Sequence, residues 1–211
     1  MQIETQSTLE PRKTPVQARS TVTVEAISEG AIQVLLSHGV DRLTTTRVAE
    51  RAGVSVGTLY QYYPNKQALL FAVLEEHLDK VVAVLTRACE ECHGLELDVM
   101  VKTVVERFVD AKMERTDVSM ALYRIAAELG GAKLVKSVGE RSNRALEKML
   151  ATAPGVDLED VKFVAWMMMA SMAGTTRAVL EAGATPAMVR RLRHHLVLLC
   201  QSYVNAARSN G

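Results

Sequence analysis

The sequence predicts an all-α fold. Apolar residues make up 48% of the 211 residues and aromatic residues only 4%. This balance suits a buried helical protein better than a β-sandwich, whose strands are rich in aromatic and β-branched residues. Apolar side chains recur at three- and four-residue steps, as on one face of a helix. No strand-length alternation, internal repeat or low-complexity tract interrupts the pattern.

The N-terminal third is expected to hold one long helix and two short ones. The long helix is amphipathic over about 16–38 and is expected to end at Gly39, since glycine favours the conformation that terminates helices. A short helix is expected at about 45–52, with Thr44 as its N-cap. A second short helix is expected after Ser55, which is also a favoured N-cap residue.

Longer helices are expected after Asn65, itself a good N-cap. Glycine, threonine and proline residues separate six amphipathic stretches, which cover about 66–92, 97–115, 117–129, 132–152, 158–182 and 186–207. Asp157 is expected to begin the fifth of these helices. The sixth has the strongest start signal, because Thr185 is a capping residue and Pro186 stands in the first helical position.

Charge is concentrated near the N-terminus although the whole chain carries only +1. Between Arg12 and Lys66 there are seven basic residues against four acidic ones. The formal charges of residues 67–211 sum to zero. A basic module on a neutral body is consistent with binding to nucleic acid.

The segment from Thr44 to Tyr63, TTTRVAERAGVSVGTLYQYY, has the pattern of a helix-turn-helix. Two short helices cross closely in this motif, so the first needs a small residue at the crossing, which Ala49 supplies. Four positions later the turn needs a residue that tolerates positive φ, and Gly53 meets that need. The second helix presents small and hydroxylated side chains that fit a major groove about 12 Å wide.

These residues and their flanks resemble the tetracycline-repressor (TetR) family of regulators. The similarity covers about residues 16–70, and it is highly specific because the motif continues into GTLYQYYPNKQALL. The preceding helix fits as well, with its AI..GA..VL..HG pattern. The matching residues are Thr44-Thr45-Thr46, Val48-Ala49, Ala52-Gly53-Val54, Gly57-Thr58-Leu59-Tyr60 and Tyr63-Pro64-Asn65-Lys66-Gln67-Ala68-Leu69-Leu70.

The resemblance implies DNA-contact roles at matching positions. Thr45, Thr46 and Arg47 would begin the positioning helix beside the DNA backbone, and Lys66 would contact a phosphate. The recognition helix would be lined by Val56, Gly57, Thr58, Tyr60 and Tyr62. The role of Lys66 has independent support, because the exposed N–H groups of a helix N-terminus attract an anion and the lysine adds a full charge. At Tyr63 ordinary packing is the favoured interpretation.

The resemblance also implies a domain order and an assembly. A flexible arm (1–15) would precede a three-helix DNA-binding domain (16–65) and a helical ligand-binding and dimerisation domain (66–211), with about nine helices in all. In this family the fourth to seventh helices surround a ligand cavity and the last two form a homodimer. On the helix expected at 158–182 one apolar stripe contains Val161, Ala165, Met168, Met172 and Val179, and a second contains Trp166, Met169, Ala173 and Leu180.

A helix that is apolar on two sides must be buried on two sides, which favours the homodimer. The candidate ligand-facing residues are Phe108, Met113, Met120, Tyr123, Arg124, Trp166 and Met169. A wall rich in methionine adapts to an apolar small molecule. The alternative is that these side chains are ordinary core, which is the commoner fate of such residues.

The run Cys89-Glu90-Glu91-Cys92-His93 matches the C-x-x-C-H pattern of covalent haem attachment. It lies at the end of a helix, with no export signal and no second candidate ligand, so we expect no haem and no other cofactor. Zinc would need further ligands. A thiol redox sensor is possible chemically, because both sulfurs lie on one helix face, and two structurally incidental thiols are the default.

The function expected from the sequence is a sequence-specific DNA-binding regulator. We expect a repressor that a small apolar ligand releases from a near-palindromic double-stranded operator; an activator or a ligand-independent regulator of the same fold is the alternative. No enzyme is expected, since no nucleophile elbow, phosphate-binding loop or metalloprotease motif is present. The polar N-terminus, the short apolar run 163–174 and three cysteines favour the cytoplasm and no membrane partner.

Overall fold

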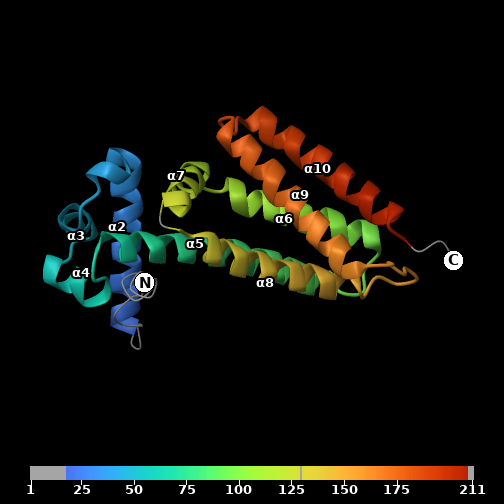
Figure 1. Cartoon of the computed structure of the whole chain (residues 1–211), viewed down its shortest axis with the longest axis horizontal. Coiled ribbons are helices and arrows are strands. Elements are labelled where there is room, and N and C mark those ends of the chain that lie inside the picture. The colour runs from blue at the N-terminus through green and yellow to red at the C-terminus, as the bar shows by residue number, and fades with distance from the viewer. Residues whose placement is uncertain (1–17, 129, 209–211) are drawn as a thin grey trace, which may run out of the picture. The chain divides into compact units, whose positions relative to one another are not determined.

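The computed structural model describes residues 18–128 and 130–208, and the side chains of all of these except 18, 19, 124, 127 and 128. The arm expected at 1–15 lies outside the described residues. The described chain is helical (Figure 1), and its helices are α2 (Ala18–Arg42), α3 (Thr45–Ala52), α4 (Val56–Tyr62), α5 (Lys66–Glu91), α6 (Leu97–Met113), α7 (Thr116–Glu128), α8 (Ala132–Leu150), α9 (Val161–Glu181) and α10 (Pro186–Ala206). The predicted all-α class is confirmed.

Local signals placed the N-terminal boundaries well. Gly39 has φ 78° and ψ 169°, so it interrupts α2 where the sequence predicts an end, and one further helical turn reaches Arg42. Thr44 caps α3 by accepting a hydrogen bond from the Arg47 N–H, and Ser55 caps α4 by accepting one from Thr58. Each cap satisfies an N–H that the first turn of a helix leaves without a partner.

The start of α9 was predicted three residues too early. Its N-cap is Asp160 and not Asp157, because the Asp160 Oδ1 accepts from the Phe163 N–H at 3.0 Å. An aspartate favours a helix start only where its carboxylate reaches the first turn, and the sequence contains two candidates. The other start is confirmed, since Thr185 caps α10 with Pro186 in its first turn.

Contacts divide the chain into two compact units. Of the described residues, the first comprises 18–77 together with 121–128 and 130–132. Its core is built by the inward faces of α2, α3, α4 and the first turns of α5, and its fully buried side chains include Ile27, Leu43, Val48, Leu59 and Leu69. This small core fixes the angle between α3 and α4.

The second unit comprises Leu78–Met120 and the chain from Lys133 onward. Its core contains Val104, Phe108, Leu146 and Met168, all with at most 2% of their surface exposed. The helices α9 and α10 form an antiparallel pair that packs on α6 (Figure 1). On α9 the structure buries Ala165, Met168 and Met172, all from the first predicted stripe. The second stripe is divided, since Leu180 is buried and Trp166 is exposed.

Candidate nucleic-acid interface

The turn between α3 and α4 is set by Gly53. It adopts φ 68° and ψ 29°, the left-handed conformation that glycine adopts without steric cost. Its N–H donates to the carbonyl of Glu50 at 3.2 Å, and the N–H of Val54 donates to the carbonyl of Ala49 at 3.0 Å. These two bonds close α3 and redirect the chain into α4, as the sequence predicts for a helix-turn-helix.

The crossing of α2 and α3 depends on a glycine that the sequence analysis missed. Ala49 is buried, as predicted, but a Cβ placed on Gly30 would lie 3.1 Å from the Ala52 nitrogen and 3.2 Å from the Val48 carbonyl oxygen. The backbones of α2 and α3 therefore approach so closely at Gly30 that a side chain there is disfavoured. The sequence around Gly30 does not single out this glycine, because its close neighbours belong to α3, which lies elsewhere in the chain.

The recognition helix α4 divides into a buried and an outward side. Leu59 and Tyr63 are buried beneath it, whereas Gly57 is exposed and Tyr60 keeps 42% of its surface exposed. Three further predicted contact residues are partly exposed, namely Val56, Thr58 and Tyr62. All five predicted recognition positions thus lie on accessible parts of one seven-residue helix.

Hydrogen bonds fix several of the predicted DNA-contact side chains. Tyr60 and Thr45 share a hydrogen bond of 3.1 Å between their hydroxyls, which links the outer sides of α4 and α3. The Arg47 Nη1 donates to the carbonyl of Arg42 at 2.6 Å. The Lys66 Nζ donates to the carbonyl of Val40 at 2.5 Å. Both cations are therefore held by carbonyl groups at the end of α2.

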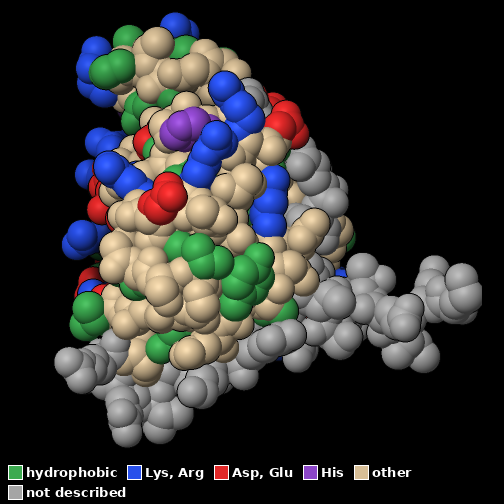
Figure 2. Space-filling model, turned by 90° about the vertical axis from the view of Figure 1, so that its left-hand side faces the viewer, with side chains coloured by type: hydrophobic (Ala, Val, Ile, Leu, Met, Phe, Trp, Pro, Cys, Tyr) green, Lys and Arg blue, Asp and Glu red, His purple; other side chains and the backbone are tan. Residues whose placement is uncertain are grey.

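Exposed basic side chains are found on α2 and α3 of the same unit. Arg42, Arg47 and Arg51 are exposed, and Thr46 beside them is exposed as well. Figure 2 faces the α3 and α4 end of the chain and shows Lys and Arg side chains gathered over the upper part of that face. A surface of this kind attracts phosphate groups, and the hydroxyls and small side chains of α4 leave room for base edges.

Tyr63 has a structural role. Burial raises the pKa of Tyr63 to about 12, and the charges of Glu76 and Tyr62 add to the shift. Tyr63 is 5% exposed. Its backbone N–H donates to the carbonyl of Leu59 and so closes α4. The packing interpretation of this tyrosine is therefore confirmed.

The ligand-facing candidates fall into different environments. Phe108 is buried in the core of the second unit, and Met113 and Met169 pack against that core. Met120 and Tyr123 are partly exposed on α7, and the side chain of Arg124 lies outside the described residues. The structure thus brings three of the seven candidates together, all within one apolar cluster.

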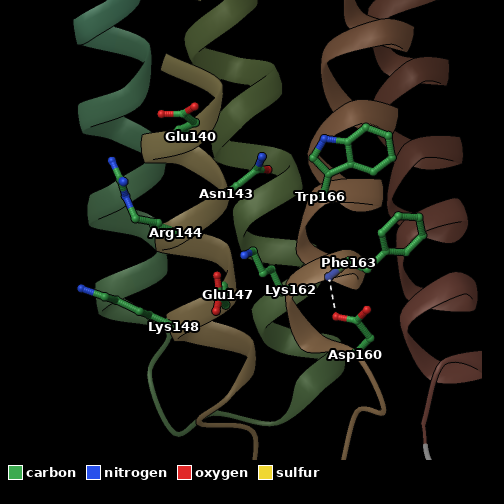
Figure 3. Close-up of a pocket in the computed structure, with 9 residues that line it drawn as sticks. All are labelled: Glu140, Asn143, Arg144, Glu147, Lys148, Asp160, Lys162, Phe163 and Trp166. Atoms are coloured by element: carbon green, nitrogen blue, oxygen red, sulfur yellow. Dashed lines mark hydrogen bonds between the residues drawn. The ribbon is translucent and has the colours of Figure 1, made fainter. Parts of the chain in front are cut away.

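Trp166 is separated from that cluster. It is 50% exposed and stacks on Phe163, itself 53% exposed, with ring centroids 5.4 Å apart. The pair borders an open cavity of about 660 Å³ on the outside of α8 and α9 (Figure 3). The cavity is lined by Glu140, Asn143, Arg144, Glu147, Lys148, Asp160, Lys162, Phe163 and Trp166.

The cysteines are poor candidates for redox chemistry. All three are free and buried. Burial raises the pKa of Cys89 to about 12, and the neighbouring Cys92 and Glu90 add to the shift. Burial also raises the pKa of Cys92. A thiol that resists ionisation is neither a strong nucleophile nor a ready metal ligand.

Comparisons with known proteins agree with this geometry. Residues 27–73 match the family model for bacterial regulatory proteins of the TetR family, and residues 96–203 match the tetracyclin repressor-like C-terminal domain. An uncharacterised HTH-type transcriptional regulator of Mycobacterium bovis is 26% identical over 183 residues, which are 86% of this chain and 79% of the relative. The tetracycline repressor protein class C of Escherichia coli is 44% identical over 54 residues, 26% of this chain and 25% of that protein.

Solved structures share the fold. A TetR-family regulator from Mesorhizobium loti superposes with a TM-score of 0.73 at 14% identity, covering 90% of this chain and 98% of that one. The fatty acid degradation regulator of Bacillus halodurans gives a TM-score of 0.68 at 17% identity, covering 89% and 96%. With its helix-turn-helix and both family domains matched, the chain belongs to the TetR family of DNA-binding transcriptional regulators.

Proposed function

We propose that this protein is a cytoplasmic repressor that binds a near-palindromic operator as a homodimer and leaves it when an apolar small molecule binds. The observation that carries the DNA-binding part is the α3–turn–α4 geometry at Gly53. It leaves Tyr60 exposed and Thr58 partly exposed on one helix, in the same compact unit as the cations Arg47 and Lys66.

The contact residues divide into two groups by chemistry. Arg47, Lys66, Thr45 and Thr46 would hold phosphates, which gives affinity and orientation without sequence choice. In α4 the base edges would meet Val56, Gly57, Thr58, Tyr60 and Tyr62. Val56 cannot donate a hydrogen bond from its side chain, so any discrimination there comes from apolar contact, as with a thymine methyl group.

The cations would exchange one partner for another on binding. Arg47 and Lys66 now donate to carbonyl oxygens at the end of α2, at 2.6 and 2.5 Å. A phosphate oxygen carries more negative charge than a carbonyl and forms a stronger, charge-assisted hydrogen bond. Operator DNA would therefore compete successfully for both side chains.

A homodimer through the last two helices is supported by apolar surface. On α9 the rings of Phe163 and Trp166 are half exposed, and on α10 Leu198 and Leu199 are 47% and 49% exposed. Among the described residues α9 is also the helix long and apolar enough to cross a bilayer, a property it shares with core helices of soluble proteins. A second copy would cover this apolar surface, and a two-fold dimer would present two α4 helices to successive major grooves.

The effector would bind between α5 and α8. An apolar ligand would have to enter the methionine-rich cluster around Phe108, with Met113 and Met169 as its adaptable wall. α5 begins at Lys66 and ends at Glu91, so the same helix carries a proposed phosphate contact and core residues such as Leu85 and Cys89. Ligand binding shifts the operator-binding equilibrium only by its different affinity for the two states.

The test is selection of bound duplexes from a random pool, followed by titration of the selected operator at several salt concentrations. Lys66→Ala is expected to weaken binding to all sequences alike and to lower the salt slope by about one. Lys102 is an exposed lysine on α6, so Lys102→Ala is the matched control. It should leave the operator affinity and the salt slope unchanged. Operator binding by Lys66→Ala as tight as wild type would remove the phosphate role, and no selected sequence at all would refute the function.

A further inference from the structure

The outward side of α9 carries an ordered set of large and small side chains. We call it the α9 outer face; it consists of Phe163, Trp166, Met167, Ala170, Ala173, Gly174 and Arg177, which recur at three- and four-residue steps. None of the seven is buried, and the opposite side of the helix supplies the core residues. Two rings stand at the start of the face, small residues in its middle and a cation at its end.

Gly174 has no explanation within its own chain. It lies in the interior of a 21-residue helix, where glycine is less favourable than alanine. A Cβ built on Gly174 meets no atom within 4 Å, so nothing in the described chain requires the side chain to be absent. Ala170, one turn earlier, is exposed as well. Small residues at this spacing fit a second helix that approaches the backbone closely.

A second copy of α9, running antiparallel across Ala170, matches the face with itself. A two-fold axis at Ala170 places each residue opposite the residue that lies equally far from Ala170, in the other direction, on the other chain. Trp166 and Met167 each meet a small residue in this arrangement. Trp166 and Gly174 each lie four residues from Ala170, and Met167 and Ala173 each lie three. The bulky indole of one chain would therefore rest on the bare backbone at Gly174 of the other.

The same pairing brings Arg177 to the aromatic pair. Phe163 and Arg177 each lie seven residues from Ala170. In its own chain Arg177 is 60% exposed and holds Glu181 at 2.7 Å. A guanidinium is attracted to the face of an aromatic ring, and the stacked Phe163–Trp166 pair offers such a face.

The cavity beside the rings supplies an acceptor for a guanidinium. Glu147 lines the same cavity from α8, while Lys162 projects into it from α9 (Figure 3). An Arg–Glu ion pair entering there would bring a cation for Glu147 and an anion for Lys162. The cavity therefore complements both members of the Arg177–Glu181 pair.

We infer that two copies of this protein pack α9 against α9 antiparallel about Ala170, so that Trp166 covers Gly174 of the other copy and Arg177 of that copy completes the cavity beside Phe163 and Trp166. The inference rests on the proposed homodimer and specifies its register. The aromatic residues are its anchors, since half-exposed rings at the centre of an interface contribute most to association.

The first experiment separates helix stability from association. Gly174→Ala should favour the α9 helix but insert a methyl group beneath Trp166, so the dimer dissociation constant from sedimentation should rise about tenfold or more. Gly139→Ala is the matched control, because Gly139 also lies inside a helix with no atom within 4 Å of a Cβ. Equal dissociation constants for the two variants would overturn the register.

The second experiment tests the geometry. Ala170→Cys on the axis should form a disulfide between two copies under mild oxidation, whereas Val99→Cys, exposed on α6, should not. Trp166 is the only tryptophan, so its fluorescence reports this surface alone; in the dimer it should resist collisional quenchers. A monomer in sedimentation refutes the homodimer itself. A dimer with no Ala170→Cys cross-link and an accessible Trp166 leaves the homodimer standing and overturns the register, with the cavity open to another occupant.

Discussion

The hydroxyl of Ser28 on α2 donates a hydrogen bond of 2.6 Å to the Oε2 of Glu76 on α5. Ser28 is only 5% exposed, and the charge of Glu76 contributes to the raised pKa of Tyr63. A carboxylate thus lies within the helix-turn-helix unit, close to the residue that ends α4. This contact ties α2 to the first part of α5 and supports the platform on which α3 and α4 lie.

Ser28→Ala is expected to destabilise the protein. The substitution removes a donor from a partly buried carboxylate, and such losses cost about 1–3 kcal/mol. The free energy of unfolding in urea measures the effect. Ser37→Ala is the control, since the Ser37 hydroxyl lies at the surface and bonds to the Gln33 carbonyl. Equal unfolding free energies for the two variants would show that the Ser28 hydrogen bond contributes no more to stability than the surface bond of Ser37.

Gly30→Ala is expected to destabilise the unit and weaken operator binding. Alanine favours a helix over glycine by about 1 kcal/mol, but the added Cβ would lie 3.1 and 3.2 Å from backbone atoms of α3. Backbone atoms in a short crossing cannot move aside cheaply, so α3 would shift. Thermal unfolding and operator titration measure both effects. A rise in Tm with unchanged operator affinity would mean that the crossing tolerates the methyl group.

Ser55→Ala is expected to loosen the recognition helix. Ser55 accepts from the Thr58 N–H at 2.9 Å and also pairs with the Thr58 hydroxyl at 2.8 Å. Loss of an N-cap costs about 1 kcal/mol, and α4 has only seven residues over which to recover it. Operator affinity should fall together with stability, and Ser55→Asn, another good cap, should restore the stability. If Ser55→Asn is as unstable as Ser55→Ala, capping is not the cause.

The native cysteines are expected to be unreactive near neutral pH. Burial raises the pKa of Cys89 and of Cys200 to about 12, so both remain thiols at about pH 7 and ionise only in strong alkali. An aromatic disulfide reagent should therefore label all three cysteines after unfolding and few before it. Rapid labelling of the folded protein, or an intramolecular disulfide after mild oxidation, would revive the redox-sensor hypothesis.

Local signals in the sequence are enough to locate most helices and to indicate the family. Caps, glycines and prolines act within one turn of the chain, so Thr44, Gly53, Ser55 and Thr185 could be located from local signals alone. The contact positions proposed on α4 were implied by the family resemblance, and they share one helix because they fall within seven consecutive residues. Asp160 was missed because two aspartates compete locally for a single start.

The buried face of each helix, and the places where helices nearly touch, depend on how the chain folds in three dimensions. α9 is apolar almost all round, so periodicity could not tell that Leu180 lies inside and Trp166 outside. Gly30 is required by the backbone of α3, eighteen or more residues away, whereas Gly174 has open space around it. Burial and close approach depend on residues far apart in the chain, and the three-dimensional fold alone brings those residues together.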